Sequence, residues 1–137
     1  MKNLITIAVD AMGGDGSPHK IIKGISEHNK KNKNIFYRLF GNKNEILKFL
    51  PKELDQNCVE IIHTDQQIEG TDTPLGAAKK GKNTSMWLAI ESVKEKKSDI
   101  IISAGNTGAL LVISKLNLKM IENIDKPALS GLWPSKK

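Results

Sequence analysis

Short apolar runs rich in β-branched residues alternate with amphipathic helix patterns, and this alternation constrains the fold more than any other feature of the chain. Strand-like runs occupy residues 4–9, 35–40, 59–62 and 99–103, and a run at residues 127–132 predicts the start of a fifth strand. Helix patterns separate these runs, as expected for parallel strands joined by crossover connections. We therefore predict an α/β fold of three layers with a mostly parallel, Rossmann-like sheet.

The helix patterns have recognisable beginnings. Ser17 can cap a helix whose first position is taken by Pro18, and the apolar stripe of that helix ends near residue 30. Further helices are predicted, in chain order, at residues 44–50, at residues 74–79, after a cap at Asn83 or Thr84, and after residue 106.

The length of 137 residues suits one domain with a buried core, so we predict a single α/β domain over residues 1–137. A parallel strand needs helices on both faces, and no helix pattern follows residues 127–132, so we expect this domain to be incomplete. No apolar run approaches the ~20 residues of a membrane-spanning helix. Residues 4–9 are too short for a secretory signal, and we expect a cytoplasmic protein.

Cysteine and histidine positions argue against metal and disulfide chemistry. Cys58 is the single cysteine, which excludes an internal disulfide framework. His19, His28 and His63 are not spaced as metal ligands. We predict neither a metal site nor a cofactor.

The net charge of +6 comes from 21 basic and 15 acidic residues, and nearly all of the basic residues are lysine, with Arg38 the one arginine. Such a balance is compatible with nucleic acid, an anionic lipid surface or an acidic protein as partner, or simply with a solvated lysine surface. Proteins that bind nucleic acid usually add arginines and stacking aromatics, whereas aromatics make up 4% here. A basic nucleic-acid-binding module therefore stays an alternative, and we expect no nucleic acid partner.

A first glycine-rich loop follows the first predicted strand. It contains Gly13, Gly14, Asp15 and Gly16 and leads directly into a helix. This geometry points backbone N–H groups and the positive end of a helix towards an anion. The alternative is a tight strand-to-helix turn in which Asp15 accepts local N–H groups.

A second glycine-rich loop follows the fourth predicted strand and also opens a helix. Gly105 permits close approach of a ligand to the backbone, and Asn106 and Thr107 place short polar side chains at the helix start. The alternative is an ordinary helix cap by Asn106 or Thr107. Because both loops follow parallel strands, we expect them at the same edge of the sheet, where such sheets bind ligands.

Two long motifs carry a family resemblance. Residues 10–18, Asp-Ala-Met-Gly-Gly-Asp-Gly-Ser-Pro, and residues 103–110, Ser-Ala-Gly-Asn-Thr-Gly-Ala-Leu, occur in the order and at the separation seen in the bacterial phosphate acyltransferases of phospholipid synthesis. The chain resembles the first part of that family's length. Lys79 and Lys126 stand where the family usually has arginine, and lysine cannot form its bidentate fork.

The resemblance implies transfer of a fatty acyl group from an acyl carrier protein thioester to inorganic phosphate, giving acyl phosphate. It also implies a homodimer, and association with a membrane glycerol-phosphate acyltransferase at the membrane periphery. On this basis Asn106 and Thr107 orient the reacting groups and Lys79 supplies positive charge. The residues expected to bind phosphate or substrate are Asp10, Gly13, Gly14, Asp15, Gly16, Ser103, Gly105 and Gly108. The alternative within the same family is a truncated, non-catalytic remnant of the enzyme.

Overall fold

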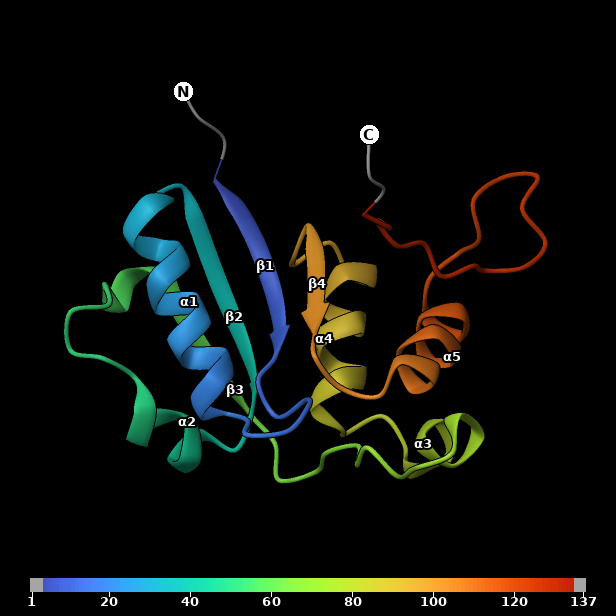
Figure 1. The fold of residues 1–137 in the computed structure, drawn as a ribbon, viewed down its shortest axis with the longest axis horizontal. Helices are drawn as coiled ribbons and strands as arrows, with labels where there is room; N and C mark the ends of the chain where they lie inside the picture. Colours follow the sequence, from blue (N-terminus) through green and yellow to red (C-terminus); the bar gives the residue numbers. More distant parts are fainter. Residues whose placement is uncertain (1–3, 135–137) are drawn as a thin grey trace.

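A computed structural model describes residues 4–134 and contains one parallel sheet of four strands in the order β3-β2-β1-β4. The strands are β1 (Ile5–Asp10), β2 (Ile35–Gly41), β3 (Val59–His63) and β4 (Ile100–Ser103). Each lies within one residue of its predicted bounds. In the register, Asp10 at the end of β1 stands beside Ser103 at the end of β4. Figure 1 shows β1 and β4 side by side, with their carboxyl ends at the same edge.

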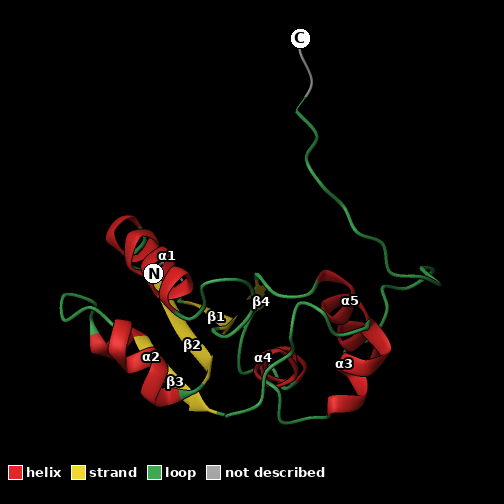
Figure 2. Cartoon of the chain, turned by 60° about the horizontal axis from the view of Figure 1, so that its bottom comes forward, coloured by secondary structure: helices red, strands yellow, loops and turns green. Residues whose placement is uncertain are grey.

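Helices cover both faces of the sheet. Their bounds are α1 (His19–Lys31), α2 (Lys43–Phe49), α3 (Pro74–Lys80), α4 (Ser85–Lys94) and α5 (Thr107–Asn117), and a short 3-10 helix, η1 (Gln56–Cys58), precedes β3. One face of β1 and β2 packs against α1 and α2, through Ile7, Leu39, Ile22 and Ile46. The opposite face packs on α4 (Figure 2). The predicted three-layer α/β arrangement is confirmed.

A second apolar cluster joins α3, α4 and α5 beside the sheet. Met86 and Ile90 of α4 and Ile113 of α5 are almost completely buried in it, together with Ala77 of α3. This packing holds the start of α5 next to the start of α4. The loop after β4 is therefore placed by the helix cluster as well as by the sheet.

The helix starts follow the predicted capping chemistry with one exception. Thr84 caps α4 through Trp87 N–H, and Asn106 caps α5 through Ala109 N–H. The predicted start of the first helix is wrong: α1 begins at His19, Pro18 precedes it, and no side chain caps it. The Ser17 hydroxyl instead donates to the carbonyl oxygen of Gly13 at 2.6 Å, because the glycine loop folds back over it.

The predicted fifth strand at residues 127–132 is not formed. Beyond α5 the described chain has neither helix nor strand. A turn closed by Ile124 N–H on the carbonyl oxygen of Ile121, with Asn123 at φ 65°, redirects the chain, which runs away from the sheet (Figure 2). An apolar run becomes a strand only beside a partner strand that offers backbone hydrogen bonds. The predicted run has no such partner among the described residues, and its side chains Leu129 and Leu132 are exposed.

Candidate functional site

The two glycine-rich loops meet at the carboxyl edge of the sheet. A Cβ at Gly14, whose φ is +87°, would overlap the carbonyl oxygen of Ala104, and a Cβ at Gly13 would lie 2.9 Å from Gly105 N. Side chains at these positions would push the loops apart. The expectation that both loops share one edge is confirmed, and glycine is what permits their contact.

Asp10 lies beneath this contact and is 1% exposed. Its carboxylate accepts hydrogen bonds from Ser85 Oγ at 2.6 Å and from Ser103 Oγ at 2.8 Å. Burial raises the pKa of Asp10 above its usual range, while the bonds from Ser85, Ser103 and the backbone of Met12 and Gly13 oppose that rise. The side chain thus joins β1, β4 and α4 below the site.

An open cleft of about 580 Å³, called here the loop cleft, runs between the two loops and the segment that follows β3. Its lining residues are Met12, Gly14, Asp15, Ser17, Glu45, Gln67, Ile68, Glu69, Gly70, Ala104, Gly105, Asn106, Thr107 and Gly108. Six of the residues predicted from sequence are therefore brought together: Gly14, Asp15, Gly105, Asn106, Thr107 and Gly108.

The other predicted site residues lie outside this lining. Asp10, Gly13 and Ser103 support the loops from below, through the contacts given above. Gly16 packs next to the Lys20 side chain at the start of α1. Lys79 is exposed on α3 and lines neither the loop cleft nor the pocket beside it.

Both polar atoms of the Asn106 side chain form hydrogen bonds within the protein. Its Oδ1 accepts Ala109 N–H at 3.0 Å, which caps α5. Its Nδ2 donates to the carbonyl oxygens of Gly70 at 3.2 Å and Asp72 at 2.8 Å. The side chain therefore ties the segment after β3 to the start of α5, which makes Asn106 a positioning residue for the cleft wall.

The first turn of α5 presents backbone donors to the loop cleft. The first N–H groups of a helix have no intrahelical acceptor. In α5, Asn106 satisfies Ala109 through its side chain and Leu110 through its carbonyl oxygen. Within residues 4–134 no protein acceptor pairs with the N–H groups of Thr107 and Gly108. Both residues line the cleft, so these two donors can meet an anion there.

The side-chain charge of the loop cleft is negative. Asp15, Glu45 and Glu69 line it, and no lysine, arginine or histidine is among its lining residues. Lys79, the cation predicted for the site, does not line the cleft, and no other basic side chain takes its place there. Its neighbour Lys80 forms an ion pair with Asp72 at 2.6 Å and lines the adjacent pocket.

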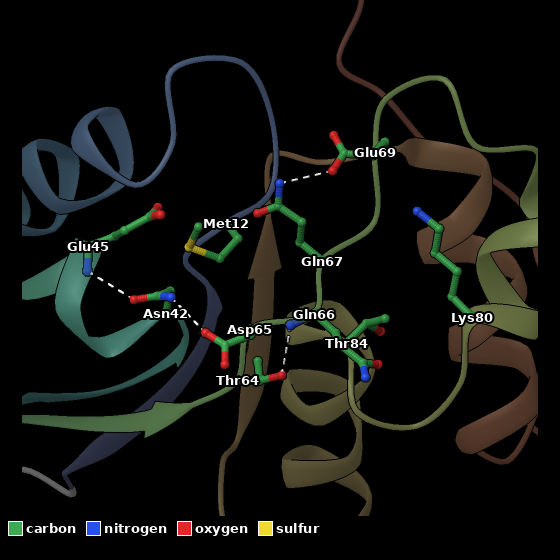
Figure 3. A pocket seen from close by; sticks show the side chains of 10 residues that line it. All are labelled: Met12, Asn42, Glu45, Thr64, Asp65, Gln66, Gln67, Glu69, Lys80 and Thr84. Atoms are coloured by element: carbon green, nitrogen blue, oxygen red, sulfur yellow. Dashed lines mark hydrogen bonds between the residues drawn. The ribbon is translucent and has the colours of Figure 1, made fainter.

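That adjacent pocket, called here the side pocket, has a volume of about 570 Å³ and is drawn in Figure 3. Its lining residues are Met12, Asn42, Glu45, Thr64, Asp65, Gln66, Gln67, Glu69, Lys80 and Thr84. Four of them, Met12, Glu45, Gln67 and Glu69, also line the loop cleft, so the two cavities share a wall.

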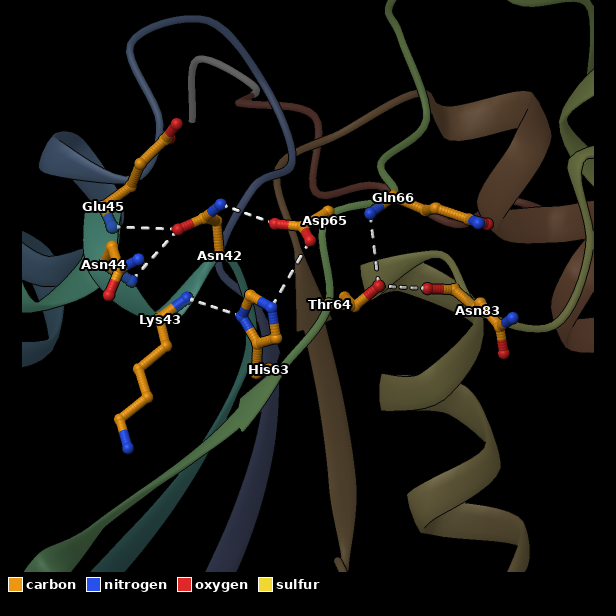
Figure 4. A network of polar contacts seen from close by, with 9 residues as sticks. All are labelled: Asn42, Lys43, Asn44, Glu45, His63, Thr64, Asp65, Gln66 and Asn83. Carbon is orange, nitrogen blue, oxygen red and sulfur yellow. Dashed lines mark hydrogen bonds and ion pairs between the residues drawn. The ribbon is translucent and has the colours of Figure 1, made fainter.

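A polar network holds the wall of the side pocket (Figure 4). Asn42 Oδ1 accepts the N–H of Glu45 at 3.1 Å and caps α2, while Asn42 Nδ2 donates to Asp65 at 2.7 Å. His63 Nδ1 accepts Lys43 N–H at 3.1 Å. These contacts join the ends of β2 and β3 and position Glu45.

Sequence reasoning missed the contribution of Glu45, Gln67, Glu69 and Gly70 to the cleft. The segment after β3 has no glycine-rich motif. The topology could have indicated these residues, because the segments that follow β2 and β3 also begin at the carboxyl edge of the sheet.

The described residues contain no group of three or more His, Cys, Asp or Glu side chains arranged to hold a metal ion. Nor does any helix within residues 4–134 combine the length and apolar character needed to cross a membrane.

Residues 5–137 match the protein family described as "Fatty acid synthesis protein". The chain belongs to this family. It is 69% identical over 137 residues to the phosphate acyltransferase of Pelagibacter ubique, covering 100% of this chain and 41% of that protein. It is 41% identical over 133 residues to the phosphate acyltransferase of Parvibaculum lavamentivorans, covering 96% of this chain and 37% of the relative.

A third family member, the phosphate acyltransferase of Listeria welshimeri, is 43% identical over 129 residues, which cover 94% of this chain and 37% of the relative. The chain thus spans about two fifths of the length of these relatives. The resemblance to the first part of the bacterial phosphate acyltransferases is confirmed.

Proposed function

We propose that this chain provides the phosphate-binding part of a site that transfers a fatty acyl group from an acyl carrier protein thioester to inorganic phosphate. The observation that carries the proposal is that Thr107 and Gly108, whose N–H groups have no protein acceptor within residues 4–134, line a cleft formed by both family motifs. The relatives' name, phosphate acyltransferase, supports transfer of an acyl group to phosphate. Thr107 and the loop backbone orient phosphate, and Asn106 positions the wall that carries them.

The chemistry needs little from side chains. A phosphate oxygen attacks the thioester carbonyl carbon, the carbonyl oxygen gains negative charge, and the carbon–sulfur bond then breaks. The proton of hydrogen phosphate passes to the departing thiolate, so the products are acyl phosphate and the free carrier thiol. Because phosphate is already an anionic nucleophile, orientation and stabilisation of the oxyanion by N–H donors matter most.

The carboxylates of Asp15, Glu45 and Glu69 oppose the entry of phosphate. We therefore propose that this chain alone binds phosphate weakly. Lys79 supplies its positive charge from outside the set of residues that line the cleft. The lysine-rich surface suits an acidic carrier protein, and a homodimer and a membrane glycerol-phosphate acyltransferase are the proposed partners in the cell.

The first test is titration of the ¹⁵N-labelled chain with inorganic phosphate, followed by NMR. The backbone amide signals of Thr107 and Gly108 should shift, and Glu45→Gln should increase the affinity about two- to fivefold, because one repelling charge is removed. An uncharged change outside the cleft, Asn44→Ala, should leave the affinity unchanged. Phosphate shifts confined to other regions would refute the proposed binding site.

The second test is acyl phosphate formation, measured as phosphate-dependent release of the carrier thiol. Turnover should fall in Thr107→Pro, which removes one of the two N–H donors while proline remains compatible with a first helical position. A chain that binds phosphate at Thr107 without any turnover would identify it as the non-catalytic alternative.

A further inference from the structure

Ser103, the last residue of β4, holds the start of the second glycine-rich loop from below. Its hydroxyl donates to Asp10 Oδ2 at 2.8 Å, and the same oxygen accepts the N–H of Gly105 at 3.1 Å. Asp10 in turn accepts the hydroxyl of Ser85 at 2.6 Å. A chain of hydrogen bonds therefore runs from α4 through a buried carboxylate to the backbone of the loop.

The carboxylate of Asp10 sets the direction of these bonds. A carboxylate only accepts hydrogen bonds, so the single proton of the Ser103 hydroxyl is directed to Asp10. The oxygen of Ser103 then has lone pairs alone to offer, and Gly105 N–H is the loop donor that it accepts. Ser103 thus acts on the loop as an acceptor of fixed orientation.

The bond to Ser103 orients the peptide group between Ala104 and Gly105. The N–H and C=O of a planar trans peptide point in opposite directions. The carbonyl oxygen of Ala104 accordingly lies against Gly14 of the first loop, where an added Cβ would overlap it. Gly105 lines the loop cleft, yet its N–H is engaged by Ser103, which is not among the lining residues. This N–H is therefore not free for a ligand in the cleft.

We infer that Ser103 is a positioning residue for the loop cleft: by holding Gly105 N–H, it sets the backbone that presents the N–H groups of Thr107 and Gly108 to phosphate. The inference rests on the proposed function, which assigns those two groups to phosphate binding. Ser103 acts through the backbone and does not contact phosphate itself. Because glycine turns easily, the peptide group before Gly105 can rotate once this bond is lost, and the residues that follow move with it.

Ser85 offers a matched comparison, because it binds the same carboxylate from α4. Both its side chain and Asp10 are 1% exposed, and its hydroxyl donates to the other carboxylate oxygen, Oδ1. Within residues 4–134 the Ser85 hydroxyl has no hydrogen bond to either glycine loop. If Ser103 only stabilised the fold, loss of either hydroxyl would affect phosphate binding equally.

The first test is NMR titration of three ¹⁵N-labelled variants with inorganic phosphate. Ser103→Ala should weaken phosphate binding by at least about fivefold, because the donors of the loop lose their fixed orientation. Ser103→Thr keeps the hydroxyl and should bind phosphate within about twofold of the unchanged chain. Ser85→Ala should lose stability and keep the phosphate affinity. Equal affinity losses in Ser103→Ala and Ser85→Ala would overturn the inference.

The second test is hydrogen exchange of the loop amides, which needs neither phosphate nor a variant. Within residues 4–134 the N–H of Gly105 has a protein acceptor, whereas those of Thr107 and Gly108 have none. In the unchanged chain Gly105 should therefore exchange at least about tenfold more slowly, relative to its intrinsic rate, than the other two amides. Ser103→Ala should abolish this protection and Ser85→Ala should retain it. Equal exchange of all three amides in the unchanged chain would contradict the assigned role of Ser103.

These outcomes are separable from those of the proposed function. Phosphate shifts at Thr107 and Gly108 whose affinity survives Ser103→Ala would reject the inference and leave the proposed function standing. A protected Gly105 amide without phosphate shifts at Thr107 and Gly108 in the unchanged chain would reject the proposed function, and with it the role of Ser103 in phosphate binding.

Discussion

Ser85 Oγ donates a 2.6 Å hydrogen bond to Asp10 Oδ1, which joins the first residue of α4 to the last residue of β1 across 75 positions of sequence. Both side chains are 1% exposed. The second carboxylate oxygen of Asp10 is held by Ser103, the last residue of β4. One buried carboxylate therefore sets the relative positions of two strands and a helix beneath the glycine loops.

Ser85→Ala is expected to lower the free energy of unfolding by about 1.5–3 kcal/mol, because it removes a hydrogen bond to a buried charged group. Urea unfolding followed by circular dichroism measures the change. Ser26→Ala is the control: Ser26 is half-buried on α1 without a side-chain hydrogen bond among the described residues, and its loss should cost less than about 0.5 kcal/mol. Equal losses of unfolding free energy in the two variants would contradict the stabilising contribution expected of the Ser85–Asp10 hydrogen bond.

The raised pKa of Asp10 predicts a pH dependence of stability. Since the folded state holds this proton more tightly than the unfolded state, whose pKa is near 3.8, stability should fall as the pH rises from 3.8 through the folded pKa. Asp10→Asn cannot titrate and should lose this slope. Urea unfolding at a series of pH values compares the two proteins, and a stability difference that is constant with pH, or that grows with the opposite sign, would contradict the prediction.

Gly14→Ala should separate the two glycine loops. The new Cβ would meet the carbonyl oxygen of Ala104, and alanine disfavours the φ of +87° at this position. We expect a loss of about 1–3 kcal/mol of stability and weaker phosphate binding. Gly24→Ala is the matched control, because nothing lies within 4 Å of its added Cβ and alanine favours the middle of α1. Unchanged phosphate binding in Gly14→Ala would argue against a shared site.

Two changes at Asn106 separate its two roles. Asn106→Asp keeps an acceptor for Ala109 N–H but removes the donor to Gly70 and Asp72, so α5 should stay capped while the segment at residues 70–72 loosens. Asn106→Ala removes both contacts and should cost about 1 kcal/mol more, from the lost cap. Hydrogen exchange of residues 70–72 and thermal unfolding distinguish them. Faster exchange in the alanine variant alone would show that the side-chain donor does not hold this segment.

The strands and most helix starts could be predicted from local sequence, because their signals are local. Burial of a β-branched run and capping by Thr84 or Asn106 involve residues within a few positions of one another. Ser17 shows the limit of this reasoning. It has the right residue type for a cap, yet the glycine loop turns its hydroxyl back to Gly13.

The candidate site was predicted in part. Topology places both glycine loops at one edge, so Gly14, Gly105, Thr107 and Gly108 could be selected from sequence. The role of Asn106 in holding residues 70–72 could not, since those partners are more than thirty positions away and have no motif. Lys79 was selected through the family resemblance, and only the structure shows that it lines neither cavity, whereas its neighbour Lys80 lines the side pocket.

The sequence by itself determined the order of strands and helices, the need for glycine at the two turns and the family to which the chain belongs. These properties depend on residue type, spacing and similarity, which are written in the linear chain. Only the tertiary structure decided that Asp10 supports the site from below and that carboxylates from α2 and the segment after β3 line the cleft. Those facts depend on which distant segments share a wall, and packing of the whole chain sets that arrangement.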